Sequence, residues 1–141
     1  MKNQKVWNDI APYFKPQNTS DQWGDPAKMD PLTLYSLFSL RRALGLAIHV
    51  HCGTQGKHVK GSFHYSGLAV DVHIGHNIPV VDQYLMVEKY NLFSGIGVYP
   101  DWNRPGLHLD VGGGIRRPAR WIKKDGVYLA WNWNNLKKCE V

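Results

Sequence analysis

Two short segments of the chain alternate between apolar and polar residues with a period of two. Residues 68–74 read LAVDVHI and residues 107–111 read LHLDV. Because successive side chains of a β-strand point to opposite faces, each segment predicts a strand with one apolar and one polar face. Asp71 and His108 then lie on the polar faces. If the two strands are neighbours, these side chains share one face of a sheet.

The rest of the chain predicts helices between strands. Asp30 followed by Pro31 is a cap and first-turn signal, and apolar residues at helical spacing continue to Gly45, so we expect a helix over 31–44. We also expect a second helix over 80–90 and strands over 46–52 and 95–99. The connection between the last two strands is too short for a parallel crossover. The fold class is therefore α+β, a small antiparallel sheet with helices.

The length of 141 residues and the apolar content of 43% fit one domain with one core. Residues 1–30 hold several prolines among polar residues, which predicts an irregular arm with little regular structure. We expect four aromatic residues to hold this arm on the core: Trp7, Tyr13, Phe14 and Trp23. Residues 31–141 form the single domain. We expect no membrane span and no signal peptide.

The charged residues exclude some classes of function. Lys and Arg total 17 against 11 acids, but the cations are spread out and no nucleic-acid motif accompanies them, so we expect no nucleic-acid partner. The formal net charge of +6 indicates either a solvated basic face or a surface that attracts an anionic substrate such as a bacterial cell wall. Glu88 and Glu140 are the only glutamates and do not suit a paired-glutamate glycosidase. Cys52 and Cys139 are too few for a disulfide framework.

Histidine is frequent, with seven residues, and one histidine comes just before the first alternating strand. If the strands are neighbours, His64, Asp71 and His108 can converge. Two imidazoles and one carboxylate suit a catalytic zinc ion, because they leave one position open for water. The alternative is that both histidines are structural and simply hydrogen-bonded, in a domain without metal.

Residues 62–71, SFHYSGLAVD, resemble the S-x-H-x-x-G-x-A-x-D signature of the M15 zinc peptidases. These are D-alanyl-D-alanine carboxypeptidases and phage peptidoglycan endopeptidases that share a fold with the hedgehog signalling domain. Residues 106–111, GLHLDV, are similar to the second signature of that family. Residues 95–100, GIGVYP, look like the preceding strand in the subfamily of the muramoyl-pentapeptide carboxypeptidase. The resemblance runs from about residue 31 to residue 121.

The resemblance implies that His64, Asp71 and His108 bind one Zn²⁺. It also implies that Ser62 is a hydrogen-bonding residue behind the ligands and that Gly67 permits a close approach of backbone. Ala69 leaves room beside the metal. Asp110 either orients a ligand or is an exposed strand aspartate.

Two departures from the family pattern concern the catalytic residues. The positions where the family places its general base hold Pro105 and Gly106, so Asp101, which resembles a glutamate position of the hedgehog relatives, is the candidate base. The family arginine is missing from residues 51–56. His51, Lys57 or Lys60 can take its place as electrophile, and His49 or His51 can transfer protons. Cys52 beside them is interpreted as a buried thiol.

The sequence therefore predicts a zinc-dependent peptidase that hydrolyses an amide bond in bacterial peptidoglycan stem peptides, as a carboxypeptidase or an endolysin-type endopeptidase. The alternative is a non-catalytic, zinc-stabilised module that binds cell wall or a phage partner. We expect a monomer made in the host cytoplasm. It would act at the wall after holin-type release or as a virion component.

Overall fold

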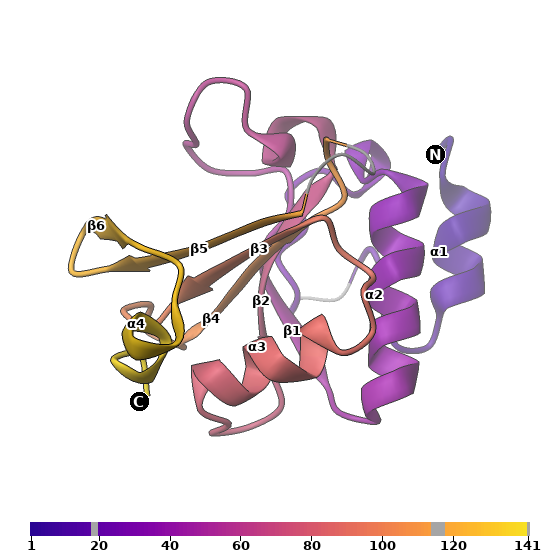
Figure 1. Cartoon of the computed structure of the whole chain (residues 1–141). Coiled ribbons are helices and arrows are strands. Elements are labelled where there is room, and N and C mark those ends of the chain that lie inside the picture. The colour runs from indigo at the N-terminus through magenta and orange to yellow at the C-terminus, as the bar shows by residue number, and fades with distance from the viewer. Residues whose placement is uncertain (18–19, 114–117, 141) are drawn as a thin grey trace.

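A computed structural model describes residues 1–17, 20–113 and 118–140 and has the predicted α+β architecture (Figure 1). Its centre is a six-stranded sheet in the order β1-β2-β4-β3-β5-β6. The strands are β1 (Ile48–Cys52), β2 (Ala69–Ile74), β3 (Gly95–Tyr99), β4 (Gly106–Asp110), β5 (Ala119–Lys124) and β6 (Val127–Leu129). The four strands expected from the sequence are all present, each within two residues of its predicted limits.

The sheet is mixed, so the expectation of a purely antiparallel sheet is wrong in one place. β3 and β4 are antiparallel, as the short connection requires, but β5 pairs with β3 in parallel. A parallel partner is possible there because β4 and its turns provide a long connection. The sequence analysis assigned no element to β5, β6 or the C-terminal helix α4 (Trp133–Lys137).

Both predicted helices are present as α2 (Pro31–Leu44) and α3 (Val80–Glu88). The side chain of Asp30 accepts a hydrogen bond from the backbone N–H of Leu32, which caps α2 at its start. Gly45 ends α2 in the left-handed conformation, with φ of 66°. Two short 3-10 turns complete the elements, η1 (Pro26–Lys28) and η2 (Phe63–Ser66).

The N-terminal arm contains more regular structure than predicted, because residues 4–10 form the helix α1 (Gln4–Ile10). The first proline of the arm, Pro12, comes after this helix and does not interrupt it. Val6, Trp7 and Ile10 lie on its buried side, and α1 packs beside α2 (Figure 1). Of the four aromatic residues expected to hold the arm on the core, Trp7, Phe14 and Trp23 are buried, while Tyr13 is exposed against Phe38.

The two faces of the sheet differ in chemistry, as the alternation predicted. One face supplies the core with the apolar side chains of every second strand residue, packed with those of α2 and α3. These include Val70, Val72, Ile74, Ile96, Val98, Leu107, Leu109 and Ile122. The opposite face carries Asp71 beside His108 in register, and Gly97 of β3 and Trp121 of β5 continue the same row. Among the described helices, none combines the length and apolar character that crossing a bilayer requires.

Candidate metal centre

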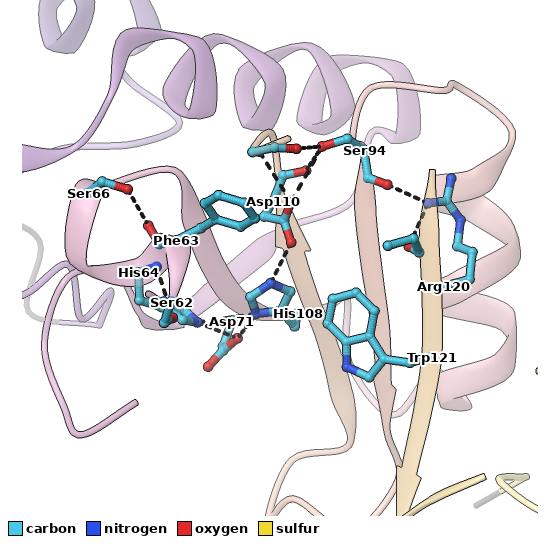
Figure 2. A network of polar contacts seen from close by, with 12 residues as sticks. Ser62, Phe63, His64, Ser66, Asp71, Ser94, His108, Asp110, Arg120 and Trp121 are labelled. Carbon is cyan, nitrogen blue, oxygen red and sulfur yellow. Dashed lines mark hydrogen bonds and ion pairs between the residues drawn. The ribbon is translucent and has the colours of Figure 1, made fainter. Parts of the chain in front are cut away.

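Three elements bring His64, Asp71 and His108 together on the polar face. Asp71 of β2 and His108 of β4 are direct cross-strand partners. His64 lies on η2, whose first turn is capped by Ser62, since the Ser62 hydroxyl accepts a hydrogen bond from the backbone N–H of His64. The three residues that the sequence predicted as metal ligands therefore converge, and Figure 2 shows them around one point.

Gly67 fixes the end of the η2 turn. Its φ is 72°, and a Cβ atom at this position would lie 1.9 Å from the carbonyl oxygen of Lys28. Its carbonyl accepts hydrogen bonds from the backbone of Asp30 and the hydroxyl of Thr33. Only a residue without a side chain allows this close approach. The approach expected at Gly67 is thus made by the Lys28 backbone, and it anchors the turn that carries His64.

The three candidate donor atoms form a triangle with equal sides. His64 Nε2 and His108 Nδ1 each lie 3.2 Å from Asp71 Oδ1, and they lie 3.2 Å from each other. Ligands at about 2.0–2.1 Å from a tetrahedral zinc ion are separated by about 3.3 Å. The spacing of the three atoms therefore matches one face of a zinc coordination tetrahedron.

The opposite nitrogen of each imidazole is already engaged. His64 Nδ1 lies 2.7 Å from the carbonyl oxygen of Gly53, and His108 Nε2 lies 2.8 Å from Asp110 Oδ2. Because both oxygens accept hydrogen bonds, both of these ring nitrogens carry protons and donate. The nitrogens that face Asp71 are then the ones with free lone pairs, which is the arrangement that metal-binding histidines use.

Charge reinforces this arrangement. Burial raises the pKa of Asp71, but hydrogen bonds with His108 and His64 outweigh it and lower the pKa to about 2. Burial lowers the pKa of His108, yet its contacts with Asp110 and Asp71 more than offset this and the pKa lies above its usual value. Three acceptor atoms around one point require a cation between them. A proton on His108 meets that need without metal, and a metal ion would replace the proton.

Asp110 is completely buried, so it is not an exposed strand aspartate but the residue that orients His108 (Figure 2). Its Oδ1 atom accepts a hydrogen bond from the backbone N–H of Gly112. Space for the carboxylate comes from Gly95, its cross-strand partner, where a Cβ would lie 2.2 Å from Asp110 Oδ2. The alternation showed the direction of Asp110, but neither its burial nor the role of Gly95 could be predicted.

A second group of candidate donors shares His64. Cys52, His58 and His64 also place one donor atom each within metal-binding reach. However, His64 Nδ1 and His58 Nε2 each lie 2.7 Å from a backbone carbonyl oxygen, of Gly53 and Gln55. Burial, and then the charge of Asp71, raises the pKa of the Cys52 thiol to about 12. In the metal-free protein these two nitrogens donate to carbonyl oxygens and the thiol keeps its proton, so a metal ion would have to displace more protons here than beside Asp71. Cys52 is a half-buried thiol, as expected.

A cavity of about 740 Å³ opens over His64, Asp71 and His108. Lys57 and Lys60, which the sequence singled out, line it together with Lys123. Four aromatic residues that were not predicted as site residues form much of its wall: Tyr99, Trp102, Trp121 and Tyr128. Trp121 lies over Gly97, where a Cβ would be 2.5 Å from the indole, and its ring is 5.2 Å from that of His108. Trp121 and Tyr128 were missed because β5 and β6 were not recognised, whereas Tyr99 lies on a strand that was predicted, β3, and Trp102 lies in the turn after it.

The two predicted catalytic residues lie outside this cavity. Asp101 is in the turn after β3, where it accepts a hydrogen bond from the backbone N–H of Asp125 and lies 4.0 Å from Lys124 Nζ. His51 contacts His73 and lines a separate cavity. The structure therefore assembles the three predicted ligands but brings neither Asp101 nor His51 to them.

Comparison of the chain with protein-family models, curated proteins and solved structures finds no match. The functional interpretation consequently depends on the two short signature-like segments and on the geometry of this centre.

Proposed function

We propose that the chain is a zinc-dependent peptidase that hydrolyses an amide bond in bacterial peptidoglycan stem peptides. The observation that carries the proposal is the convergence of three donor atoms, 3.2 Å apart, whose imidazoles are fixed from behind by Gly53 and Asp110. The resemblance of residues 62–71 and 106–111 to the M15 signatures supplies the reaction and substrate class. On this proposal the protein acts at the bacterial cell wall.

Two imidazoles and a carboxylate fit Zn²⁺, and three protein ligands leave a position for water and substrate, as catalytic zinc sites require. Bound zinc would lower the pKa of that water and polarise the scissile carbonyl. The residues of the chain then have distinct tasks. His64, Asp71 and His108 hold the ion, and Asp110 keeps His108 in the tautomer that coordinates.

The walls of the cavity favour an extended, partly anionic substrate. Lys57, Lys60 and Lys123 surround the opening, and the stacked rings of Tyr99 and Trp102, with centroids 4.4 Å apart, form an apolar wall. Lysine ammonium groups attract substrate carboxylates, so on this proposal they take over the task of the missing family arginine. We assign them the role of binding substrate charge.

The first test is metal content together with hydrolysis. The His64, Asp71 and His108 centre of the purified protein should hold one equivalent of zinc. The protein should release new amino groups from purified peptidoglycan, and a chelator should stop the release until zinc is restored. The Lys123→Gln variant should keep its zinc and bind substrate more weakly. Protein that binds no metal at neutral pH, and melts at the same temperature with zinc and with chelator, would contradict the proposal.

One observation favours the second candidate, a non-catalytic zinc module that binds cell wall. Among the described residues lining the cavity, Asp71 and Asp110 are the only carboxylates, and both are engaged with His108. A general base of the expected kind is therefore not next to the predicted ligands. A zinc-loaded protein that sediments with peptidoglycan but releases no amino groups would establish this function instead.

The Asp101→Asn variant addresses the base directly. If zinc is retained and hydrolysis is lost, Asp101 reaches the substrate after a movement of the turn between β3 and β4. If hydrolysis continues, the proton is taken by another group of the cavity, and Asp101 has the structural role that its hydrogen bond to Asp125 indicates.

A further inference from the structure

A second group of histidines lies on the same face of the sheet, at its β1 edge. His49 and His51 flank Val50 on β1, and His73 of β2 is the cross-strand partner of His49. The register shifts between Val50 and Cys52, so His51 is the additional residue of a β-bulge and its side chain reaches His73. Three imidazoles from two strands therefore form one cluster, which we call the β1–β2 histidine cluster.

The rings of this cluster are in direct contact. His51 Nε2 and His73 Nδ1 face each other within hydrogen-bonding distance, and the ring centroids are 4.7 Å apart. His49 stacks on His73 with centroids 4.5 Å apart. A hydrogen bond between two imidazoles needs one proton between two nitrogens. A metal ion would take the place of that proton and bind both nitrogens.

The cluster faces its own cavity, of about 450 Å³. Trp102 lines this cavity and also the cavity over His64, Asp71 and His108, so its ring stands between the two. The wall of the smaller cavity holds a fourth histidine, His76, and the exposed Arg104. No carboxylate is among the described residues that form this wall, which distinguishes it chemically from the first centre.

We propose that His49, His51 and His73 form a second metal site that binds a borderline transition metal through nitrogen alone. Imidazole suits Cu²⁺, Ni²⁺ and Zn²⁺, whereas Mg²⁺ and Ca²⁺ prefer carboxylate ligands, which none of the described residues lining this cavity carries. Copper binds most tightly of the three in the usual order of affinities. The nitrogens of His51 and His73 already face each other, but the His49 ring is stacked on His73 and its nitrogens do not converge with theirs, so metal binding requires the His49 ring to turn away from the stack. This site goes beyond the proposed peptidase function and does not depend on it.

Counting bound zinc by native mass spectrometry tests the second site. The wild-type chain should bind two equivalents, and the His73→Asn and His49→Asn variants should each bind one. The His76→Asn variant is the matched control, because it removes an exposed histidine from the same cavity, and it should still bind two. The His108→Ala variant should lose the first equivalent and keep the second, so the two sites are judged separately. Thermal melts of each variant in chelator confirm that it is folded.

Copper gives an independent readout. One equivalent of Cu²⁺ added to the metal-free His108→Ala variant, in which the first centre is removed, should give an electron paramagnetic resonance spectrum with couplings to several imidazole nitrogens. The His73→Asn substitution in the same background should abolish that spectrum. A wild-type chain that binds a single zinc ion, or a folded His73→Asn variant that still binds two, would overturn the second site.

Discussion

The two sides of the His64 ring carry similar sets of donor atoms with opposite chemistry. On the Nε2 side, Asp71 and His108 present lone pairs and a carboxylate charge. On the Nδ1 side, Cys52 Sγ lies 3.5 Å from His58 Nε2 and 4.0 Å from His64 Nδ1, and the backbone carbonyls of Gly53 and Gln55 accept hydrogen bonds from the two rings. The comparison teaches that the distance between donor atoms does not define a metal site. The groups behind the donors decide which atoms are unprotonated.

Removal of a ligand on the Nε2 side should have the largest effect. In His108→Ala only two donors remain and the buried carboxylate of Asp110 loses its contact with the imidazole, so zinc at the first centre should fall from one equivalent to below about 0.1 equivalent. Inductively coupled plasma mass spectrometry measures this on protein with one zinc equivalent added, in the His73→Asn background that removes the proposed second site. His76→Ala, which removes an exposed histidine, is the control and should keep its zinc.

Lowering the pH should progressively weaken zinc binding on the Nε2 side of His64. Because the pKa of His108 is raised, its protonated form stabilises the metal-free protein below about 6.5, and that contribution is lost as the pH rises through the raised pKa. Zinc needs the deprotonated form, so the gain in melting temperature should be small at pH 5 and grow toward pH 8. With zinc at 100 times its Kd the gain is about 2.7 kcal/mol, or roughly 5–10 °C in a domain of this size.

Parallel melts with zinc and with chelator at each pH provide the measurement. A gain that stays constant from pH 5 to pH 8 would show that histidines are not among the ligands, because protons would then not compete with the metal.

Loss of the charge behind His108 should have an intermediate effect. Asp110→Asn keeps an acceptor of the same shape but removes the carboxylate, and the affinity for zinc should fall about 10- to 100-fold. A competition titration against a chromophoric chelator measures the change. Unchanged affinity would show that the tautomer of His108 is fixed by other contacts.

Substitution on the Nδ1 side should have the smallest effect. Cys52→Ser retains a hydroxyl that can donate to the Gln55 carbonyl, as the thiol does across 3.1 Å, and zinc affinity should change less than threefold or so. The wild-type thiol, with its pKa near 12, should react slowly with iodoacetamide at pH 8. A large loss of zinc in Cys52→Ser would indicate that the metal binds on the Nδ1 side of His64, with Cys52 as a ligand.

Much of this fold follows from local patterns. The period of two in residues 68–74 and 107–111, and the cap at Asp30, predicted β2, β4 and α2 because each signal is contained within a few neighbouring residues. β5 was missed because its sequence, ARWIKK, has a single buried apolar residue, Ile122, and its pairing with β3 connects distant parts of the chain. Trp121 and Lys123 of β5 line the cavity, so this part of the cavity wall was missed with the strand.

The ligand set was predictable for a similar reason. Alternation gave the direction of Asp71 and His108, and the signature-like segment added His64. The partners behind the ligands were not predictable, because the Gly53 carbonyl approaches His64 through a loop and the position of Asp101 depends on the turn at Asp125. The arm at residues 1–30 shows the reverse error: its prolines were given too much weight, and the seven residues before them form α1.

Gly95 contributes to the metal centre although it supplies no ligand. The absence of a side chain there provides the space that the Asp110 carboxylate occupies, and a single methyl group would have to displace it. A survey of all single substitutions, scored for retained zinc, should therefore rank position 95 beside the ligands themselves. Loss of zinc on substitution of Gly95 would show that this residue shapes the metal site indirectly, through Asp110 and then His108.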